Sequence, residues 1–528
     1  MSNTMDSDPA ISDRAKLSST TASSNNFKNA TPNSYTSNLF NLADTFTSSV
    51  STLSFPPLVT AARIAVIAIM SRSIGYGRLR VHTTDEILVF PSDAMRKELG
   101  LGQVKAAETV DIRVIRDTFW LRLATLGDLG FAEAYMAGDC EVSDLVKVFK
   151  IFIRSTVSSD PTVSGVSTIP SRLFSVITSA TNSRFRNTLS NSLSNISAHY
   201  DLSNGMFRSF LSADMTYSCA IFPELDRDLA GDLEAEEVNG ASGLKKIGEM
   251  KSGVDETMDE KGLRDELEEA QLAKLHHIIR KADIRAGHRV LEIGSGWGSF
   301  AIEAVRMTGC TVDTITLSSQ QKALAEERIK AAGLAGRIRV WLMDYRSLPD
   351  SWRGVFDRVV SIEMLEAIGE EYIPGYFGMI HTALNDKGVA CVQVITIPEA
   401  RLDKYRRKVD FIRKYIFPGG FLPTLSVVVD SIRVGSRNRL VVDERKPHYA
   451  RTLREWQRRF LTSFNSSIIP ALLSEHPEMT EADVQVFKRK WIYYFSYCEV
   501  GFAERVLGDH ILTMVREGNV EYGCKTFD

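Results

Sequence analysis

In the second half of the chain, short blocks of apolar residues alternate with longer segments that have helical spacing. The blocks have the length of buried strands, and strands that alternate with helices predict an α/β fold with a doubly wound, mostly parallel sheet. Ligands bind such a sheet beyond the carboxyl ends of its strands. The expected strands are Arg289 to Ile293, Thr311 to Leu317, Arg337 to Met343, Phe356 to Ile362 and Gly388 to Thr396.

Helices are expected at three further places. Ser318 and the polar residues after it are typical of a helix cap, and they predict a helix through Ala331. Leu263 to Arg280 has helical spacing and should lead into the first strand. The apolar run Leu58 to Met70 is shorter than the roughly 20 residues of a spanning helix, so it predicts an amphipathic or core helix and no transmembrane anchor.

The polar segments predict how the chain divides. Residues 1–55 are rich in Ser, Thr and Asn and have too little apolar content to form a core, so we expect disorder there. A mitochondrial transit peptide is disfavoured because acidic residues precede the first arginine. We expect a small N-terminal α+β domain at 56–154, a Ser/Thr-rich linker at 155–190 and a catalytic domain at 191–528.

An acidic insertion interrupts the expected catalytic domain. Residues 224–269 contain 16 Asp and Glu against 6 Lys and Arg. Like-charge repulsion favours a mobile loop over about 224–262. A surface loop and a regulatory lid both fit this composition, and a shorter linker in its place should leave the fold intact.

Composition is that of an intracellular globular protein. With 528 residues and 44% hydrophobic content, the chain can bury a large core. A net charge of −3 gives no global signal for nucleic acid or membrane. Its six cysteines have neither metal-ligand spacing nor a disulfide pattern, so we expect a cytoplasmic protein without a metal site.

Basic residues gather in one segment, where they could meet anionic lipid headgroups and hold the protein at the membrane periphery. A solvated helix face is the alternative. The basic residues are Arg401, Lys404, Arg406, Arg407, Lys408, Arg413 and Lys414.

The strongest local motif is the glycine turn after the first expected strand. It reads Gly294-Ser295-Gly296-Trp297-Gly298, not the G-x-G-x-x-G of dinucleotide sites. With Glu292 just before it, the turn suits S-adenosylmethionine, although tight strand–helix packing alone would also explain it. Asp344, at the end of the third strand, could accept a hydrogen bond from the adenine amino group.

Further segments give the chain a family likeness from about Gly77 to the C-terminus. It resembles the cyclopropane-fatty-acyl-phospholipid synthase family, which includes the mycolic acid cyclopropane synthases, and it is closer to the plant and fungal members. The segments that carry the likeness are 127–139, 199–204, 215–219, 291–298, 363–369, 393–398, 414–423, 449–456 and 491–502.

The resemblance implies a Rossmann-like class I methyltransferase that uses S-adenosylmethionine. Family members transfer the sulfonium methyl to a cis double bond in a phospholipid acyl chain and form a cyclopropane as a proton is lost. The expected partner is therefore an unsaturated phospholipid in a membrane, contacted transiently, with no nucleic acid; a homodimer stays open. A lipid C-methyltransferase with a methyl-branched product and a non-catalytic methyltransferase-like protein are the alternatives.

The resemblance also implies a bound bicarbonate as the base. Its cradle would consist of Cys219, Glu366, Gln393, the backbone of Ile395, and Tyr449. Many bacterial members have histidine where this chain has Gln393, and glutamine cannot titrate, so a direct general-base role for this residue is disfavoured. Burial as a small hydrophobe for Cys219, capping for Glu366 and packing for Tyr449 are the alternatives.

The implied cofactor site extends over the strand ends and the Tyr/Cys segment. Tyr200 and Tyr217 would bracket the cofactor, or serve as core aromatics. The full set is Tyr200, Tyr217, Ser218, Glu292, Gly294, Gly296, Thr316, Leu317, Gln321, Asp344 and Tyr345.

Overall fold

The computed structural model of the chain describes residues 56–98, 108–158, 204–222, 265–437, 439–445, 449–516, 519 and 522. The expected head, the linker from 159 to 190, Tyr200 and the acidic insertion over about 224–262 lie outside these residues.

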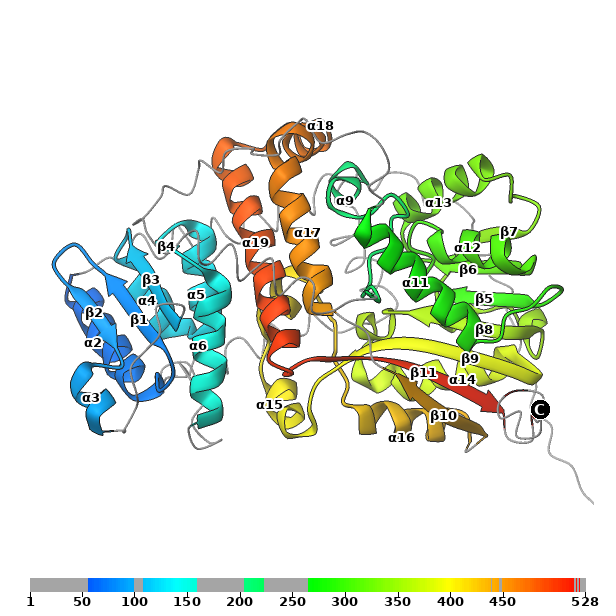
Figure 1. Ribbon diagram of the computed structural model, residues 1–528, viewed down its shortest axis with the longest axis horizontal. Helices are drawn as coiled ribbons and strands as arrows, with labels where there is room; N and C mark the ends of the chain where they lie inside the picture. Colours follow the sequence, from blue (N-terminus) through cyan, green and yellow to red (C-terminus); the bar gives the residue numbers. More distant parts are fainter. Residues whose placement is uncertain are drawn as a thin grey trace, which may run out of the picture.

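A seven-stranded sheet forms the centre of the catalytic domain, in the order β10-β11-β9-β8-β5-β6-β7 (Figure 1). Strands β5 to β9 pair in parallel, and β11 pairs antiparallel with β9 and β10. Because β11 is antiparallel, its first residues lie at the carboxyl end of β9. The strands are β5 (Arg289–Ile293), β6 (Thr311–Thr316), β7 (Ile338–Leu342), β8 (Phe356–Ile362), β9 (Leu384–Thr396), β10 (Leu440–Arg445) and β11 (Gly508–Arg516).

Helices cover both faces of this sheet. Apolar side chains of α11 (Glu266–Lys281), α12 (Ser299–Thr308) and α13 (Ser319–Ala331) form one core with the sheet. Side chains of α14 (Ile373–Ala383) and α16 (Leu425–Gly435) form a second core on the other face. The doubly wound α/β fold expected from the sequence is therefore confirmed.

A four-stranded sheet forms the smaller N-terminal domain, in the order β2-β1-β3-β4. Its strands are β1 (Arg78–His82), β2 (Ile87–Phe90), β3 (Thr109–Val114) and β4 (Cys140–Val142). Its helices are α2 (Pro56–Ser73), α3 (Asp93–Glu98), α4 (Thr118–Leu126), α5 (Asp128–Ala137) and α6 (Leu145–Ser158). Helix α6 continues into the segment expected to be a linker.

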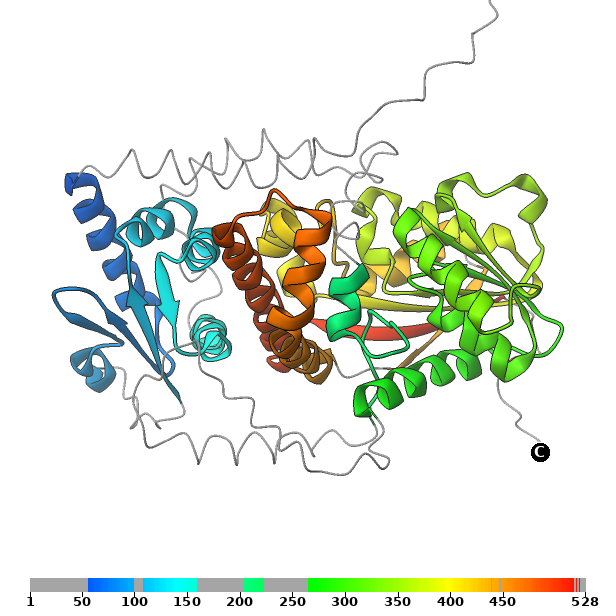
Figure 2. The same ribbon diagram turned by 90° about the horizontal axis from the view of Figure 1, so that it is seen from above.

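A layer of helices lies between the two sheets (Figure 2). Helix α19 packs against α5 and α6 on one side and against α17 on the other, and α17 packs against α9. The layer contains α9 (Asn204–Phe210), α17 (Tyr449–Ser463), the π-helical turn η10 (Phe464–Ile468), α18 (Ile469–Glu475) and α19 (Glu481–Ala503). After β9 the chain forms α15 (Leu402–Arg407) and the π-helical turn η9 (Ile412–Ile416).

The apolar run Leu58 to Met70 lies within α2, which packs against α4 through Ala62, Val66 and Met70. It is therefore a core helix of the small domain. Among the residues that the structure describes, no helix is long and apolar enough to cross a membrane.

Candidate active site

The glycine turn between β5 and α12 opens a cavity at the carboxyl end of the sheet. Gly294 and Gly296 have φ angles of 94° and 47°, in the left-handed region that favours glycine. A Cβ on Gly296 would project into open space, whereas a Cβ on Gly294 would lie 3.1 Å from Met364 Cγ. The turn therefore keeps free a space that a ligand can enter.

Most residues expected at the cofactor site line this cavity. They come from the loop after α9, from β5 and the turn after it, from the end of β6, from the start of α13, and from the segment after β7. The expected residues in its wall are Tyr217, Ser218, Glu292, Gly294, Gly296, Thr316, Leu317, Gln321 and Tyr345.

Glu292 supplies an unpaired acceptor to this wall. The residue is 3% exposed, and its Oε2 atom has no hydrogen-bond partner. Burial raises the pKa of this carboxyl to about 8. A buried acceptor in a cavity suits the hydroxyl and ammonium donors of S-adenosylmethionine, so the residues present fit this group.

Asp344 pairs with a neighbouring side chain. Its carboxylate is held by Arg346, whose Nε and Nη2 atoms donate over 2.9 and 2.6 Å, and it also caps the turn that follows. Met343 and Tyr345 line the cavity, and Asp344 is not among the lining residues. The predicted hydrogen bond from adenine to Asp344 stays a prediction, and the pairing with Arg346 leaves this carboxylate with fewer free acceptor positions.

Besides Glu292, the carboxylate of Glu363 belongs to the wall of the cavity. Glu363 directly follows β8. Its Oε1 atom accepts from the backbone N–H of Cys219 over 2.7 Å and from Gln393 Nε2 over 2.8 Å. Its Oε2 atom accepts from the Tyr449 hydroxyl over 2.5 Å. Three residues expected to hold a bicarbonate thus hold a side chain of the chain itself.

The backbone at Glu363 is unusual. Its φ angle is 47°, which side chains with a Cβ rarely adopt, and strain of this kind concentrates at functional sites. The backbone N–H donates to the carbonyl of Gln393 over 3.0 Å, and this bond fixes the turn against β9. The turn aims the carboxylate at the three donors.

Glu366 and Ile395 complete the group. The Ile395 backbone N–H donates to Glu366 Oε1 over 2.5 Å, while Glu366 Oε2 has no partner. Burial, with the nearby charge of Glu363, raises the pKa of Glu366 to about 8. The structure therefore brings together all five residues expected to form the cradle.

The cradle does not fit bicarbonate as the resemblance implied. The donors of Cys219, Gln393 and Tyr449 are already directed at Glu363, and the Ile395 N–H is directed at Glu366. A further anion would lie beside two carboxyl groups without a donor from these residues. We therefore assign the place of the anion to the Glu363 carboxylate.

A buried lysine lies behind the cradle. Lys274 on α11 donates to the Ser218 hydroxyl over 2.5 Å, and its charge acts on Glu363. Burial lowers the pKa of Lys274 below its ordinary value, although the neighbouring carboxylates act in the opposite direction. Cys219 is fully buried, and burial raises the pKa of its thiol well above the ordinary value. Its backbone, and not a thiolate, serves the site.

Aromatic side chains of α17 and α19 pack against Tyr217, a residue of the cavity wall. The Tyr217 ring lies 5.0 Å from Trp456, and Tyr449 lies 4.4 Å from Phe502. The hydroxyl groups of Tyr217 and Tyr494 are 3.1 Å apart. Of these residues, Tyr217 is the one that lines the cavity, and the apolar side of the cavity also includes Met215, Ile293 and Met364.

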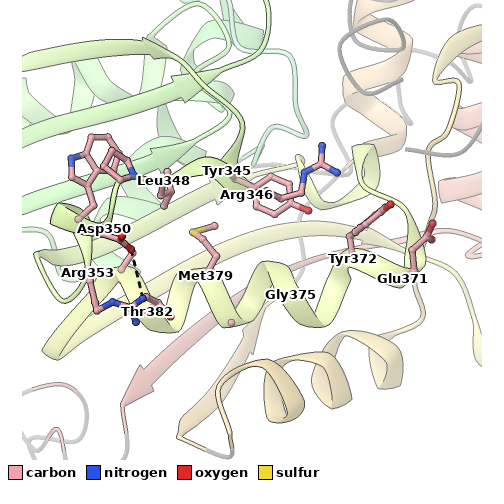
Figure 3. A pocket seen from close by; sticks show the side chains of 14 residues that line it. Tyr345, Arg346, Leu348, Asp350, Arg353, Glu371, Tyr372, Gly375, Met379 and Thr382 are labelled. Atoms are coloured by element: carbon pink, nitrogen blue, oxygen red, sulfur yellow. Dashed lines mark ion pairs between the residues drawn. The ribbon is translucent and has the colours of Figure 1, made fainter. Parts of the chain in front are cut away.

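A separate cavity lies along α14 (Figure 3). Tyr345 lines both cavities, which places the second one next to the cofactor site. Its charged groups pair with neighbours: Arg346 with Asp344, and Arg353 with Asp350 over 4.0 Å.

The basic cluster is only partly available to a partner. Arg406 pairs with Glu370, Arg413 lies 4.0 Å above the Tyr405 ring, and Lys414 donates to Glu133 over 2.7 Å. Arg401, Lys404, Arg407 and Lys408 are exposed, as is the paired Arg406.

Sequence reasoning missed Glu363, Lys274 and Asp509. Glu363 stands three residues before Glu366 in the same segment, and its position at a strand end was the signal that could have identified it. Lys274 and Asp509 reach the site from α11 and β11, and no local pattern marks them.

Comparisons with known proteins agree with this arrangement. The family model described as mycolic acid cyclopropane synthetase matches residues 187–248 and 260–510. A tuberculostearic acid methyltransferase of Mycobacterium tuberculosis is 32% identical over 76% of this chain and 82% of its own length. The cyclopropane-fatty-acyl-phospholipid synthase of Escherichia coli K12 is 28% identical over 76% of this chain and 87% of its own.

Solved structures share the fold. Coclaurine N-methyltransferase, bound to N-methylheliamine and SAH, has a TM-score of 0.50 at 14% identity and covers 74% of this chain and 99% of its own. The mycolic acid cyclopropane synthase CmaA1, complexed with SAH and CTAB, has a TM-score of 0.47 at 25% identity, over 61% of this chain and 98% of its own. Since the family model matches more than half of the chain, the chain belongs to the mycolic acid cyclopropane synthetase family of S-adenosylmethionine-dependent lipid methyltransferases.

Proposed function

We propose that this enzyme transfers a methyl group to the cis double bond of an unsaturated phospholipid acyl chain and that Glu363 takes up the proton lost from the product. One observation carries the proposal: a carboxylate held by Cys219, Gln393 and Tyr449 at the cavity that fits S-adenosylmethionine. The membership of the family, and the two relatives named for lipid substrates, support the substrate class.

S-adenosylmethionine supplies an electrophilic methyl group when it is bound. The π electrons of the acyl double bond form the new carbon–carbon bond as the sulfonium–methyl bond breaks, and the second alkene carbon is left electron-deficient. Glu363 then accepts a proton from the added methyl group, and the electron pair of that C–H bond closes the cyclopropane ring. Atoms and charge balance, with one proton on the carboxyl group at the end.

Tyr217 suits the electron-deficient stage, because its ring belongs to the wall of the cavity. A cation near the face of this ring gains about 0.5 to 2 kcal/mol. The apolar side of the cavity also excludes water, which would otherwise capture the cation. Lys274 lies behind Glu363, so its charge favours the ionised carboxylate without facing the lipid directly.

The nature of the product is part of the proposal. The Escherichia coli relative is named for a cyclopropane product, whereas the relative with 32% identity is named for tuberculostearic acid. The second name favours a methyl-branched chain as the alternative product. In both cases the first step is transfer of a methyl group to the double bond.

Contact with the membrane is proposed through exposed basic residues. Arg401, Lys404, Arg407 and Lys408 lie on and next to α15, and each basic residue near an anionic surface contributes about 1 kcal/mol. The contact is expected to be transient and to weaken as ionic strength rises.

Expression in a bacterium that lacks cyclopropane fatty acids tests the function. Cells grown with methyl-deuterated methionine should contain a new fatty acid, detected by gas chromatography with mass spectrometry, that is one CH2 group larger than its precursor. Loss of the proton from the added methyl group leaves two of its three deuterium atoms. The proton NMR spectrum then separates a cyclopropane from a branched chain, and cells whose acyl chains remain unchanged would contradict the proposal.

A further inference from the structure

Besides Glu363 and Glu366, a third carboxyl group lies at the cradle. It belongs to Asp509 on β11, next to Glu363. Asp509 is 4% exposed and pairs with Ile395 of β9 in the antiparallel ladder. Its position follows from the direction of β11, whose first residues lie where β8 and β9 end. Nothing in the expected cradle accounted for a carboxyl group here.

The side-chain amide of Gln393 bridges the two carboxyl groups. Its Nε2 atom donates to Glu363 Oε1 and to Asp509 Oδ2, both over 2.8 Å. An NH2 group has two hydrogens, so each carboxyl group receives one. Gln393 is fully buried, and this arrangement uses its donors completely.

Asp509 and Glu363 lie next to each other, because one nitrogen atom, Gln393 Nε2, is 2.8 Å from an oxygen of each. Asp509 Oδ1 has no hydrogen-bond partner among the described residues, so a proton on this carboxyl group is available for a hydrogen bond to Glu363. Both groups are shielded from water. Without the screening of water, two adjacent negative charges repel strongly. The pair therefore carries one shared proton, as adjacent carboxyl groups in other proteins do.

The surroundings decide which residue holds that proton. Glu363 receives hydrogen bonds from Cys219, Tyr449 and Gln393 and lies within reach of the Lys274 charge. Asp509 receives a hydrogen bond from Gln393, and it faces the charges of Glu363 and Glu366. Burial raises the pKa of both carboxyl groups, and together with the charges of Glu363 and Glu366 it raises the pKa of Asp509 well above its ordinary value.

Among the described residues, five titratable groups face the pair, each from a different segment of the chain. They are Cys219 after α9, Lys274 on α11, Glu366 after β8, Tyr449 on α17 and Tyr494 on α19, with Gln393 of β9 as the neutral bridge.

We propose that Asp509 is a positioning residue for the proton acceptor: its protonated carboxyl group donates to Glu363 and, together with Gln393, fixes Glu363 as the ionised member of the pair. The inference rests on the proposed function of Glu363. Ionisation of Asp509 at high pH removes this donor and adds a like charge, so the acceptor loses its alignment.

Two substitutions separate this role from a merely structural one. Asp509→Asn keeps a donor toward Glu363 and an acceptor for Gln393, but it cannot ionise. Its kcat at neutral pH should remain within about threefold of the wild type, whereas the loss of activity at high pH should disappear. Asp509→Leu removes the donor, and kcat should fall by a factor of about 10 to 100 with little change in the KM for lipid.

Melting curves and the affinity for S-adenosylmethionine show whether each variant is folded. The control variant is Asp350→Asn, at a fully exposed position. Wild-type pH profiles in both Asp509 variants would overturn the proposal. Complete loss of activity in Asp509→Asn, equal to that of Glu363→Gln, would also overturn it, because Asp509 would then be the acceptor itself.

A measurement that does not depend on turnover separates this inference from the function. Infrared difference spectra of the wild type and Asp509→Asn should show the carbonyl band of one protonated carboxyl group in the wild type alone. The band can be present even if the acyl chain is not the substrate. A spectrum without that band would overturn the inference while leaving the proposed function in place.

Discussion

A single side chain changes the chemistry expected of this site. Cys219, Gln393 and Tyr449 were expected to hold a diffusible anion, and they hold the Glu363 carboxylate. A tethered carboxylate costs no binding entropy at each turnover and occupies the site at every bicarbonate concentration. The identity of the donors could be predicted from the sequence, but their partner depends on a backbone turn with φ of 47°, which no local pattern specifies.

The glycine turn allows a direct test of the cofactor site. Gly296→Val should abolish binding of S-adenosylmethionine in calorimetry, because the new side chain projects into the open space of the cavity. Gly309→Val is the matched control, since Gly309 has a φ of 73° and open space around it but lies at the other end of α12. Both variants strain the backbone, and only the first should lose the ligand. Normal affinity in folded Gly296→Val would refute the assignment.

Glu292 should make stability depend on pH. Its folded-state pKa of about 8 lies above the ordinary 4.5, so the folded state binds the proton more tightly than the unfolded state. The stabilisation is complete below pH 4.5 and is lost as pH rises toward about 8. Glu292→Gln cannot titrate, so its denaturant-derived stability relative to the wild type should rise across that window by a few kcal/mol. Parallel stability curves would show that the pKa of Glu292 is not raised.

At the scale of elements, the sequence predicted the sheet well. The expected strands at Arg289 to Ile293 and Phe356 to Ile362 agree with β5 and β8 at both ends, because apolar blocks between polar turns mark buried parallel strands. Ser318 caps α13 as expected, accepting from the Gln321 N–H. Strand β9 begins at Leu384, earlier than predicted. Its first residues are mostly polar, so hydrophobicity did not mark them as a strand, but Leu384 pairs with Phe356 of β8.

The antiparallel strand shows where such reasoning stops. Asp509 reaches the site only because β11 inserts next to β9 in the opposite direction. A strand order is a property of long-range pairing, which depends on contacts between segments far apart in the chain. The third carboxyl group of the site could therefore not be predicted from the sequence.

Close packing of α14 against α16 gives a prediction about stability. A Cβ on Gly435 would lie 2.2 Å from the Pro374 carbonyl oxygen and 2.7 Å from the Gly378 nitrogen. Gly435→Ala should push the helices apart and cost about 1 to 3 kcal/mol in urea unfolding. Gly375→Ala on α14 meets open space and should be neutral or stabilising by up to about 1 kcal/mol. Equal stability of the two variants would contradict the packing described here.

At the scale of the whole molecule, buried polar contacts join the N-terminal domain to the catalytic domain. Glu133 on α5 is 7% exposed and accepts from Lys414 and from the Tyr415 hydroxyl, both over 2.7 Å. Arg154 on α6 pairs with Glu504 just after α19. Since Tyr494 of α19 contacts the hydroxyl group of Tyr217 in the cavity wall, the small domain supports a helix that packs next to the site.

Loss of this contact should be measurable. Glu133→Gln removes the charge that compensates Lys414 and Arg122, and it should lower the free energy of unfolding by about 1 to 3 kcal/mol. Glu141→Gln breaks a more exposed pair with Arg113 and should cost less than about 1 kcal/mol. An equal effect of both substitutions in calorimetric melting would show that the domain contact adds no stability.

The central claim is that Glu363 replaces a diffusible anion as the proton acceptor. The most direct measurement is the turnover of purified enzyme on unsaturated phospholipid vesicles, in buffer freed of bicarbonate and after bicarbonate is added back. The account predicts equal wild-type turnover in both buffers. Glu363→Gly, which suits a φ of 47° and empties the cradle, should be inactive without bicarbonate and recover activity when it is added. Wild-type turnover that requires bicarbonate, or undiminished turnover of Glu363→Gly without it, would contradict the account.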